Sequence, residues 1–486
     1  MALILNRSFI FLFLALFLSF SLLLLNANAT SSEFSTSVLN VTASLLQAQQ
    51  VFFFEYPEPS YHQHQEETQV ISTFSFSSSS SLSLQLHPRD SLLNAQHKDY
   101  RSILKSRLDR DSARVNWIIS KLQLGLSSHR NKSEHRPEGL SAPVKPGLSE
   151  GSGEYFTRIG VGQPAQQFSM VLDTGSDLSW LQCKPCSPCY QQSDPIFDPS
   201  ASSSYSPITC GAQQCNELEM SGCSNDQCEY EVEYGDGSST NGVLVSETVS
   251  FGNRVVMGCG HVNQGLFVGA AGILGLGRGP LSFLSQIKAS SFSYCLVARD
   301  SKKSSTLEFN SPRPGGSVTT QLLKNPMQGS FYYVGLAGVS VGGQRVPVPP
   351  STFAIDQSGL GGIIVDSGTA ITRLQTQAYN LVRDAFVNLT RDLPRAKGFS
   401  VLDTCYDLSS VKSFSAPTVS FQMSDGRSWV LPVTNYLMPV DNQGTFCFAF
   451  APSTAPLSII GNVQQQATRV TFDLANSIIG FSPDKC

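Results

Sequence analysis

The sequence predicts an all-β fold built from two related lobes. Downstream of Gly151, short runs rich in β-branched and aromatic residues alternate with Gly, Pro and Asn turns. An Asp–hydroxyl–Gly triplet ends two apolar runs, in VLDTGSDLSW at 171–180 and in IIVDSGTAIT at 363–372, and the two acids are 193 positions apart. An apolar-apolar-Gly run follows each triplet, 100 and 93 residues later when counted from glycine to glycine. This repeated frame predicts a duplicated lobe with one acid on each half.

Residues 1–29 are predicted to be a signal peptide. Arg7 is the only basic residue in this segment, residues 9–25 are apolar or small, and the Ala-Asn-Ala at 27–29 has the form of a cleavage site. The alternative is a membrane anchor, because the apolar run is nearly long enough to span a bilayer. The cleavage-site pattern favours removal. No other segment could span a membrane, so we expect no stable membrane anchor.

Residues 30–145 are predicted to be a propeptide in two parts. Residues 30 to about 85 contain the Ser-rich run STFSFSSSSSLSL and few charges, so we expect them to be poorly ordered. Residues 87–145 carry apolar residues at helical spacing, with 12 basic and 6 acidic side chains against 20 and 26 in the body that follows. The linker at 134–156 is rich in Pro, Gly and Ser, which predicts an exposed, cleavable segment. Together these features favour a prosegment that covers the body of its own chain over a disordered N-terminal tail.

The chain contains twelve cysteines, all at or after Cys183. An even count behind a signal peptide predicts disulfides, six if all pair. The cluster CKPCSPC at 183–189 could instead bind zinc, but a closed zinc site needs four ligands, usually from two such pairs or with His. We therefore favour disulfides and a route through the secretory pathway. The destination would be the endoplasmic reticulum, the vacuole or the extracellular space (apoplast).

The sequence lacks the residues that several classes of protein require. The balance of 33 Lys and Arg against 37 Asp and Glu gives no reason to expect a nucleic-acid partner. Of seven histidines only His261 lies beyond residue 135. A hydrolase with a Ser or Cys nucleophile could therefore use only His261 as its histidine base. His261 lies close to a predicted disulfide, and we expect it to be structural. A zinc hydrolase would lack a His pair, and the sequence has no GxxxxGK[ST] phosphate loop.

The two remaining acids, Asp173 and Asp366, suit a carboxylate pair. Taken singly, an Asp–hydroxyl–Gly triplet indicates an Asx turn at a strand end, but two in a repeated frame are stronger evidence. Two carboxylates about 3 Å apart share one proton, and the ionised one can draw a proton from a water that attacks a peptide carbonyl. Hydroxyls could cross between the loops, glycines could let N–H groups approach the carboxylates, and further hydroxyls could steady the outer oxygens. These residues are Thr174 and Ser367, Gly175 and Gly368, and Ser176 and Thr369, respectively.

The motifs VLDTGSDLSW, EYGDGSSTNG, GILGLG, IIVDSGTAIT and SIIGNVQQQATRVTFDLANSIIGFSP, in this order, closely resemble those of the pepsin-like aspartic proteases. The match covers residues 152–486. It implies a bilobal pepsin-like fold, with two pseudo-twofold-related lobes at 146–330 and 331–486 and an active-site cleft between them. It also implies that Asp173 and Asp366 are the catalytic dyad.

The resemblance assigns two aromatic residues to the substrate site. Tyr234 matches a tyrosine on a hairpin flap that closes over the substrate, and Trp180 matches the tryptophan whose indole N–H holds that tyrosine. The alternative for Tyr234 is an aromatic residue in a core strand. The adjacent Gly-Asp-Gly-Ser favours a hairpin tip.

The stretch between Trp180 and Tyr234 holds seven cysteines and resembles the insertion of the nepenthesin-like and guard-cell-type aspartic proteases of plants. Sequence alone leaves the connectivity of the cysteines open. The pairing that this subgroup implies is Cys183–Cys186, Cys189–Cys259, Cys210–Cys228, Cys215–Cys223, Cys295–Cys486 and Cys405–Cys447. The second triplet is Asp-Ser-Gly where many relatives have Asp-Thr-Gly, but the hydroxyl is kept. Inactive relatives such as xylanase inhibitors tend to lose one triplet, and both are intact here.

Together, residues and resemblance predict an aspartic endopeptidase made as a secretory zymogen with an acidic pH optimum. Its partners would be protein or peptide substrates and its own propeptide, and we expect a monomer that needs no metal or cofactor. We hypothesise that acidification discharges the carboxylates that hold the basic prosegment and so weakens its grip. Two alternatives are a non-catalytic binding protein on the same fold, such as an inhibitor of another hydrolase, and a glycosidase. Asn388 is a predicted glycosylation site of the mature body, and Asn40 and Asn131 are others in the propeptide.

Overall fold

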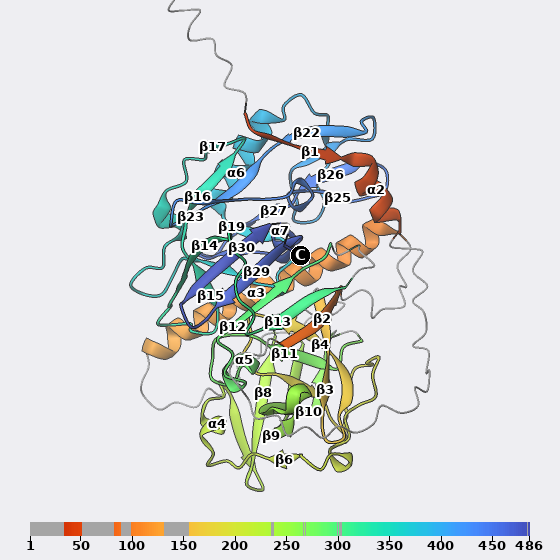
Figure 1. Ribbon diagram of the computed structural model, residues 1–486, viewed down its shortest axis with the longest axis vertical. Coiled ribbons are helices and arrows are strands. Elements are labelled where there is room, and N and C mark those ends of the chain that lie inside the picture. The colour runs from red at the N-terminus through yellow and green to blue at the C-terminus, as the bar shows by residue number, and fades with distance from the viewer. Residues whose placement is uncertain are drawn as a thin grey trace, which may run out of the picture. The chain divides into compact units, whose positions relative to one another are not determined.

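Strands dominate the structure, which is a computed structural model of the 486-residue chain (Figure 1). It describes residues 34–50, 82–88, 99–130, 155–234, 238–265, 267, 269–298, 300, 304–483 and 485–486, with the backbone alone at residues 50 and 124–130. The predicted signal peptide, most of the Ser-rich run and most of the predicted linker lie outside these residues. The last two residues of that linker, Tyr155 and Phe156, are buried in the strand Tyr155–Val161, so the expectation of exposure is wrong for them. The helices and strands all belong to one unit, Thr36–Cys486. Within this described part, no helix is both long and apolar enough to cross a membrane.

The first lobe, residues 155–309, consists of short strands with little helix, as the turn-rich sequence predicts. The β4 segment FSMVLD is buried on both faces, which explains its nearly continuous apolar sequence. The strands are β3 (Tyr155–Val161), β4 (Gln166–Asp173), β5 (Trp180–Gln182), β6 (Ser206–Pro207), β7 (Ser221–Ser224), β8 (Gln227–Glu233), β9 (Ser239–Thr248), β10 (Arg254–Gln264), β11 (Gly272–Gly275), β12 (Ser291–Cys295) and β13 (Ser305–Phe309). The helices are α4 (Gln213–Asn216) and α5 (Phe283–Gln286).

The second lobe, residues 318–483, is also built of strands but contains one longer helix, α6 (Thr376–Leu389). Its buried side chains include Ala378, Val382 and Phe386, which recur every four residues and form one apolar stripe. The short helix is α7 (Asn462–Gln465). The strands are β14 (Val318–Leu323), β15 (Tyr332–Val334), β16 (Leu336–Val341), β17 (Gln344–Arg345), β18 (Ile363–Val365), β19 (Thr372–Gln375), β20 (Arg395–Ala396), β21 (Cys405–Asp407), β22 (Ser413–Pro417), β23 (Val419–Met423), β24 (Ser428–Val430), β25 (Leu437–Pro439), β26 (Thr445–Phe448), β27 (Phe450–Ser453), β28 (Ser458–Ile460), β29 (Thr468–Asp473) and β30 (Ile478–Pro483).

The repeated frame of the sequence is a repeated structure. In the first lobe β11 lies parallel to β4, with Gly275 opposite Asp173. In the second lobe β28 lies parallel to β18, so that Ile460 is opposite Val365, the residue before Asp366. Each apolar-apolar-Gly run therefore lies beside the strand that leads into an acid, and the prediction of two related lobes is confirmed.

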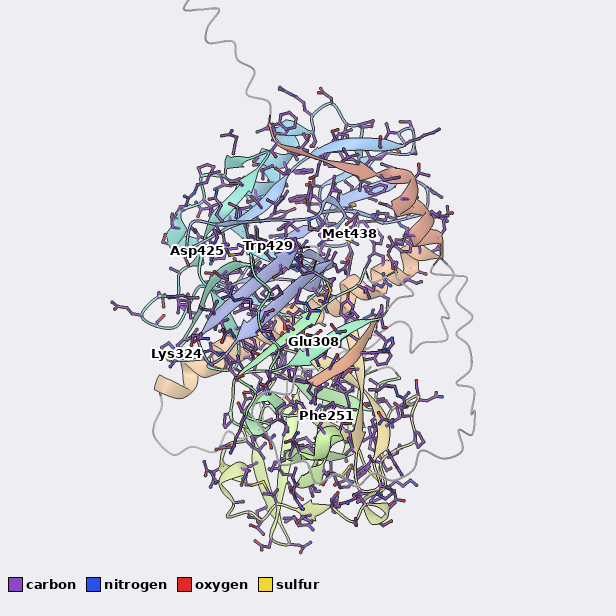
Figure 2. All side chains as sticks on the ribbon, viewed as in Figure 1. Phe251, Glu308, Lys324, Asp425, Trp429 and Met438 are labelled. Atoms are coloured by element: carbon purple, nitrogen blue, oxygen red, sulfur yellow. A yellow bond between two sulfur atoms is a disulfide. The ribbon has the colours of Figure 1, made fainter. Side chains whose placement is uncertain are left out.

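One sheet joins the two halves of the chain. β12 pairs with both β13 and β29, although β29 comes from the end of the sequence. Across this sheet Arg469 of β29 lies 2.9 Å from Glu308 of β13, which is labelled in Figure 2. Phe292 stacks on Phe472 with 4.4 Å between ring centroids. Since the last strands are built into the sheet that the first lobe shares, the lobes have a rigid common base.

The expectation of poor order across residues 30 to about 85 is wrong for the described parts of this range. β1 (Thr36–Asn40) pairs with β22, and α2 (Val41–Gln50) follows it. β2 (Leu82–Pro88) lies between β3 and β13 and pairs with both (Figure 1). Ser-rich composition lowers apolar burial, but a strand that adds to a sheet gains main-chain hydrogen bonds that do not depend on side chains. The expected helix appears further on as α3 (Tyr100–Arg130).

All twelve cysteines are paired, but four of the six implied pairings are wrong. The structure contains Cys183–Cys259, Cys186–Cys189, Cys210–Cys223, Cys215–Cys228, Cys295–Cys486 and Cys405–Cys447. Only the last two agree with the pairing that the subgroup implies.

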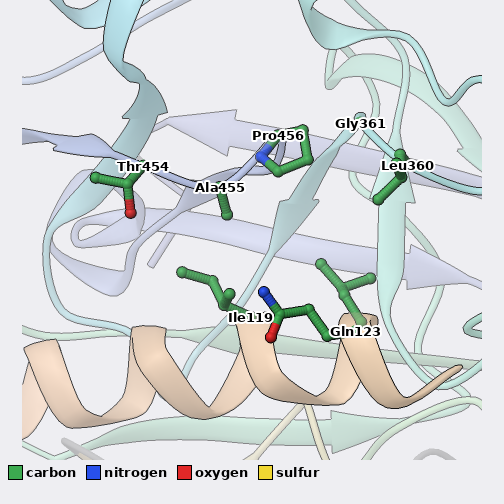
Figure 3. Close-up of a pocket in the computed structure, with 8 residues that line it drawn as sticks. Ile119, Gln123, Leu360, Gly361, Thr454, Ala455 and Pro456 are labelled. Carbon is green, nitrogen blue, oxygen red and sulfur yellow. The ribbon is translucent and has the colours of Figure 1, made fainter. Parts of the chain in front are cut away.

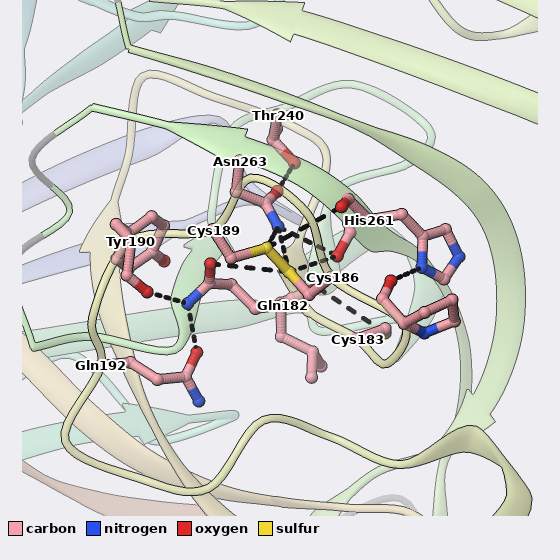
Figure 4. The surroundings of a disulfide bond; sticks show 12 residues. Gln182, Cys183, Cys186, Cys189, Tyr190, Gln192, Thr240, His261 and Asn263 are labelled. Atoms are coloured by element: carbon pink, nitrogen blue, oxygen red, sulfur yellow. Dashed lines mark hydrogen bonds between the residues drawn. A yellow bond between two sulfur atoms is a disulfide. The ribbon is translucent and has the colours of Figure 1, made fainter.

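Strand register explains two of the four corrected pairs. Cys183 follows β5, which runs parallel to β10, so its main-chain N–H reaches the Gly260 carbonyl and its Cα lies 5.3 Å from that of Cys259. Because Cys259 is already bonded to Cys183, Cys186 pairs with Cys189 in the turn that follows (Figure 4). Beside this disulfide the Asn263 side-chain amide donates to the Gly260 carbonyl. Such contacts depend on which strands are neighbours, and spacing in the sequence does not reveal that.

Replacing both Cys295 and Cys486 with serine should lower the free energy of unfolding more than replacing both Cys186 and Cys189. The first bridge joins residues 191 positions apart and the second joins residues 3 apart. Loop-closure entropy gives about 5 kcal/mol for the long loop and about 2 kcal/mol for the short one. Urea denaturation of the two double variants measures the difference, and equal losses would contradict the loop-length account.

Candidate active site

Asp173 and Asp366 occupy matching positions at the ends of two buried strands. Both side chains are almost fully buried, with 2% and 1% of their residue surface exposed. The Gly175 N–H donates to Asp173 Oδ1 at 2.9 Å and Ser176 Oγ donates to Oδ2 at 2.8 Å. In the second loop Thr369 Oγ1 donates to Asp366 Oδ2 at 2.7 Å. The hydroxyls predicted to steady the outer oxygens are therefore in contact with them.

Thr174 and Ser367 cross between the two loops, as the sequence suggested. The Ser367 N–H donates to Thr174 Oγ1 at 2.9 Å, and the Thr174 N–H donates to Ser367 Oγ at 3.3 Å. Asn462 of α7 fixes the second loop through its side-chain amide, which donates to the Ser367 carbonyl at 2.9 Å. These reciprocal bonds hold the two acids in one fixed arrangement.

A guanidinium group lies between the two carboxylates. Arg114 of α3 places Nη1 and Nη2 at 3.0 and 2.5 Å from the two oxygens of Asp173. Its Nε and Nη2 lie 3.1 and 3.0 Å from the two oxygens of Asp366. A Cβ on Gly175 would meet Arg114 Nη2 at 2.1 Å, so glycine is required for this approach. One fork of donors thus reaches both acids, which shows that they are close enough to share a single partner.

The pKa values of Asp366 and Arg114 are both shifted in this arrangement. Burial raises the pKa of the Asp366 carboxyl, but the charge of Arg114 and hydrogen bonds from Arg114, Thr369 and the Gly368 backbone outweigh burial and hold this pKa below its ordinary value. Burial lowers the pKa of Arg114, but the two carboxylates raise it by a larger amount, so the net shift is upward. In this arrangement the ionised forms stabilise each other.

Helix α3 runs across the middle of the structure (Figure 1) and contacts both lobes. Its Arg107 lies 2.8 Å from Asp300, and further along the helix Trp117 Nε1 donates to the Glu233 carbonyl at 3.0 Å. Beyond these contacts Ile119 and Gln123 of α3 border a small pocket, whose other wall is formed by residues 360–361 and 454–456 of the second lobe (Figure 3). The helix therefore occupies the space directly over the acids.

Tyr234 and Trp180 are in direct contact. Trp180 Nε1 donates to the Tyr234 hydroxyl at 2.8 Å, and both side chains are buried. Burial raises the pKa of Tyr234 well above its ordinary value, although the Trp180 bond opposes the shift. Tyr234 directly follows β8 of the β8–β9 hairpin, and Trp117 of α3 lies 5.9 Å from its ring. The predicted tip at 235–237 lies outside the described residues.

Other chemistries find no support among the described residues. His261 is partly exposed, and its Nδ1 contacts the Pro185 carbonyl at 2.9 Å, far in sequence from both acids. Every cysteine is in a disulfide, so none is a free nucleophile. In the described part of the chain, no cluster of three or more His, Cys, Asp or Glu residues could hold a metal ion.

Two of the three predicted glycosylation sites fall on described residues. Asn388 is exposed near the end of α6, and the sequon Thr390 is buried with its hydroxyl bonded to the Phe386 carbonyl. Asn40 is exposed, but its side chain accepts from the Ala43 N–H at the start of α2. Asn131 lies outside the described residues. Glycosylation of these residues stays a prediction.

Sequence reasoning missed two residues of the site. Arg114 was one of 12 basic residues between His87 and Lys145, and nothing in the pattern distinguishes it from the others. Asp111, three residues earlier on the same helix face, bonds to the loop after Asp366. The spacing of Asp111 and Arg114, three positions apart on a helix, is a possible signal in the sequence. The residues that these two side chains contact, however, depend on how α3 docks.

Comparison with known proteins gives close relatives. Residues 155–310 match the family described as xylanase inhibitor N-terminal, and residues 331–483 match xylanase inhibitor C-terminal. The Arabidopsis thaliana protein ASPARTIC PROTEASE IN GUARD CELL 2 is 44% identical over 406 residues, which cover 82% of this chain and 86% of that protein. Aspartyl protease family protein 2, also from Arabidopsis thaliana, is 50% identical over 81% of this chain and 85% of its own. Aspartic proteinase nepenthesin-1 of Nepenthes gracilis is 41% identical over 71% of this chain and 80% of its own.

Two solved structures share the fold at lower identity. The crystal structure of edgp superposes with a TM-score of 0.54 and 23% identity, covering 68% of this chain and 91% of that one. Conglutin gamma, a basic 7S globulin from lupine seeds, gives 0.53 and 19%, with the same coverage. At this identity they support the bilobal fold alone.

Proposed function

Because the chain belongs to the pepsin-like aspartic protease family, in the nepenthesin-like and guard-cell-type subgroup of plants, and is an aspartic-type endopeptidase, we propose that Asp173 and Asp366 are its catalytic dyad. The observation that carries this proposal is the fork of Arg114, which lies within hydrogen-bond distance of all four carboxylate oxygens. A single nitrogen, Nη2, lies within 3.0 Å of one oxygen of each acid, so the two carboxylates are close neighbours that could share a proton once the cation leaves. The crossed Thr174 and Ser367 contacts support this by fixing the pair.

The geometry supports hydrolysis by an activated water. Without a cation between them, two close carboxylates cannot both ionise, so one proton is shared. The ionised carboxylate takes a proton from the water, whose oxygen forms a bond to the peptide carbonyl carbon. The protonated carboxyl donates a hydrogen bond to the developing oxyanion. The C–N bond then breaks as the amine nitrogen takes the proton that the other carboxylate accepted from the water. These steps need only the two acids and water, so the proposal includes no metal or cofactor.

The β8–β9 hairpin would act as a flap over an extended peptide. Tyr234 on this hairpin is held by Trp180 and faces Trp117 of α3, which marks the place where a bound chain would lie. The substrates are therefore proteins or peptides. Because both acids come from one chain, we expect the processed enzyme to act as a monomer.

Residues 30–145 would form an inhibitory prosegment of a zymogen. Arg114 fills the space between the acids, so the attacking water and the substrate are excluded while α3 is docked. The cleavage region would lie in the predicted linker at 134–156, before Tyr155 and Phe156, which are buried in β3. Activation would separate the prosegment from the lobes at 146–330 and 331–486. An acidic pH optimum follows, because the shared proton of the dyad is lost as pH rises.

The disulfides support passage through the secretory pathway. Six disulfides form in an oxidising compartment, and the predicted signal peptide at 1–29 would direct the chain to one. The endoplasmic reticulum, the vacuole and the extracellular space (apoplast) all meet this requirement.

The test is cleavage of a peptide substrate by the processed chain from pH 2 to pH 8. We expect activity on the acid side and none near pH 8. A folded, processed chain that cleaves no peptide at any pH would overturn the proposal. The fold would then serve binding or inhibition of another protein, as the name of the matching family suggests for other members.

A further inference from the structure

Asp111 of α3 is bound in a built carboxylate site of the second lobe. Its Oδ1 accepts from the main-chain N–H of Ala370 at 2.6 Å and from that of Ile371 at 3.1 Å. Its Oδ2 forms an ion pair with Nη2 of Arg373 on β19. Two successive amides and a guanidinium therefore surround one carboxylate. This is the arrangement that binds anions in proteins.

The site belongs to the second lobe and not to the helix. Arg373 is only 5% exposed, and among the described residues Asp111 is its one acidic partner. The Nε atom of Arg373 has no hydrogen-bond partner in the described part of the chain. When α3 leaves, a cation and two N–H groups lose their acceptor at once. With α3 gone the guanidinium is uncovered, and this cation beside two N–H groups would favour a new anion.

We propose that this site, Ala370, Ile371 and Arg373, binds an aspartate or glutamate side chain of the substrate in the processed enzyme. The inference rests on the proposed function, because it requires Asp173 and Asp366 to cut a peptide in the cleft that α3 vacates. Asp111 then marks where the substrate carboxylate lies.

The helix also indicates how far this site is from the scissile bond. Asp111 lies three residues before Arg114, or about 4.5 Å along the helix axis. An extended substrate advances about 3.3 Å per residue, so the acidic residue would lie within about two positions of the cleaved bond.

A main-chain carbonyl of the substrate could also accept from the Ala370 and Ile371 amides. A carbonyl carries no charge, however, so it would leave the Arg373 guanidinium without an ion-pair partner. The competing arrangement thus predicts no preference between a carboxylate and its amide, and the two can be distinguished with matched peptides.

The experiment measures kcat/KM for peptide pairs that differ only by Glu against Gln, scanned over the two positions on each side of the cleaved bond. The enzyme is the processed form of the full chain, assayed at about pH 5, where a free glutamate side chain is mostly ionised. We expect the Glu peptide to be cut about tenfold to a hundredfold faster at one position, as for hydrogen bonds to a charged group. Arg373→Gln should remove this preference, so that the ratio of Glu to Gln rates falls to about one. Arg391→Gln, at an exposed arginine of the same lobe, should keep it.

The outcomes separate the two proposals. Equal rates for Glu and Gln peptides at all four positions, with active wild type, overturn the carboxylate site and leave the protease function intact. No cleavage of either peptide overturns the proposed function itself. If Arg373→Gln fails to fold, the wild-type ratio of Glu to Gln decides, since only an anion-binding site raises it above one. An Arg373→Gln enzyme that folds and keeps the full preference would also overturn the assignment.

Discussion

Asp173→Asn should lower the kcat/KM of peptide hydrolysis about a hundredfold to ten-thousandfold from pH 2 to pH 8. Asparagine keeps the size of the side chain and an oxygen for the Gly175 N–H, so the loop should hold its shape. It cannot share or accept the proton that the reaction moves, and proton transfer of this kind accounts for about 10²–10⁴ in rate. Initial rates on a peptide whose cleavage changes its fluorescence measure the loss.

Asp366→Asn should have the same effect, and the double variant should be no slower than either single one, because the two acids act as a unit. Asp384→Asn, at an exposed acid of α6, is the matched control and should keep wild-type rates. Melting temperatures of all four proteins check that folding is unchanged. If Asp173→Asn retained more than a tenth of the activity, the assignment of the dyad would be wrong.

The repeated frame made the centre of the site predictable from the sequence. Asp173 and Asp366 each end an apolar strand, and the glycine of each later run marks the strand that lies beside it. The contacts around each acid involve residues one to three positions away, such as Ser176 and Thr369. Local contacts of this kind follow from the order of residues, because a turn after a strand can place them in only a few ways.

Long-range contacts were not predictable in the same way. The pairing of Cys183 with Cys259 depends on the parallel alignment of β5 and β10, which are 72 or more residues apart. β1 and β2 each place an apolar side chain, Leu39 and Leu86, in the core, but they are short and lie in Ser-rich surroundings, so the sequence did not indicate them. The helix at 100–130 was expected, but its rotation about its own axis decides which basic residue meets the acids. That rotation is set by tertiary contacts such as those of Asp111 and Trp117.

Arg114→Met should make the unprocessed chain active. Methionine fills similar space without charge, so the two carboxylates would lose the cation that links them to α3. Removing one partner of a buried ion pair costs about 3–5 kcal/mol, which corresponds to docking of α3 that is a hundredfold to a few thousandfold weaker. At about pH 5 we therefore expect unprocessed Arg114→Met to cleave a small peptide at least a hundredfold faster than unprocessed wild type. Mass spectrometry confirms that the linker is intact during the assay.

The pH dependence of α3 docking should change sign in the same variant. In wild type the pKa of Asp366 is lowered by the docked guanidinium, so this stabilisation is present at neutral pH and is lost as pH falls through the lowered pKa. Wild type should therefore release α3 only on strong acidification. In the Arg114→Met variant, burial of two carboxylates without a cation opposes docking at neutral pH, and protonation relieves that opposition. Lys105→Met, at an exposed position of the same helix, is the control and should behave as wild type. If the Arg114→Met chain stays inactive until it is processed, then α3 blocks the cleft without the charge of Arg114.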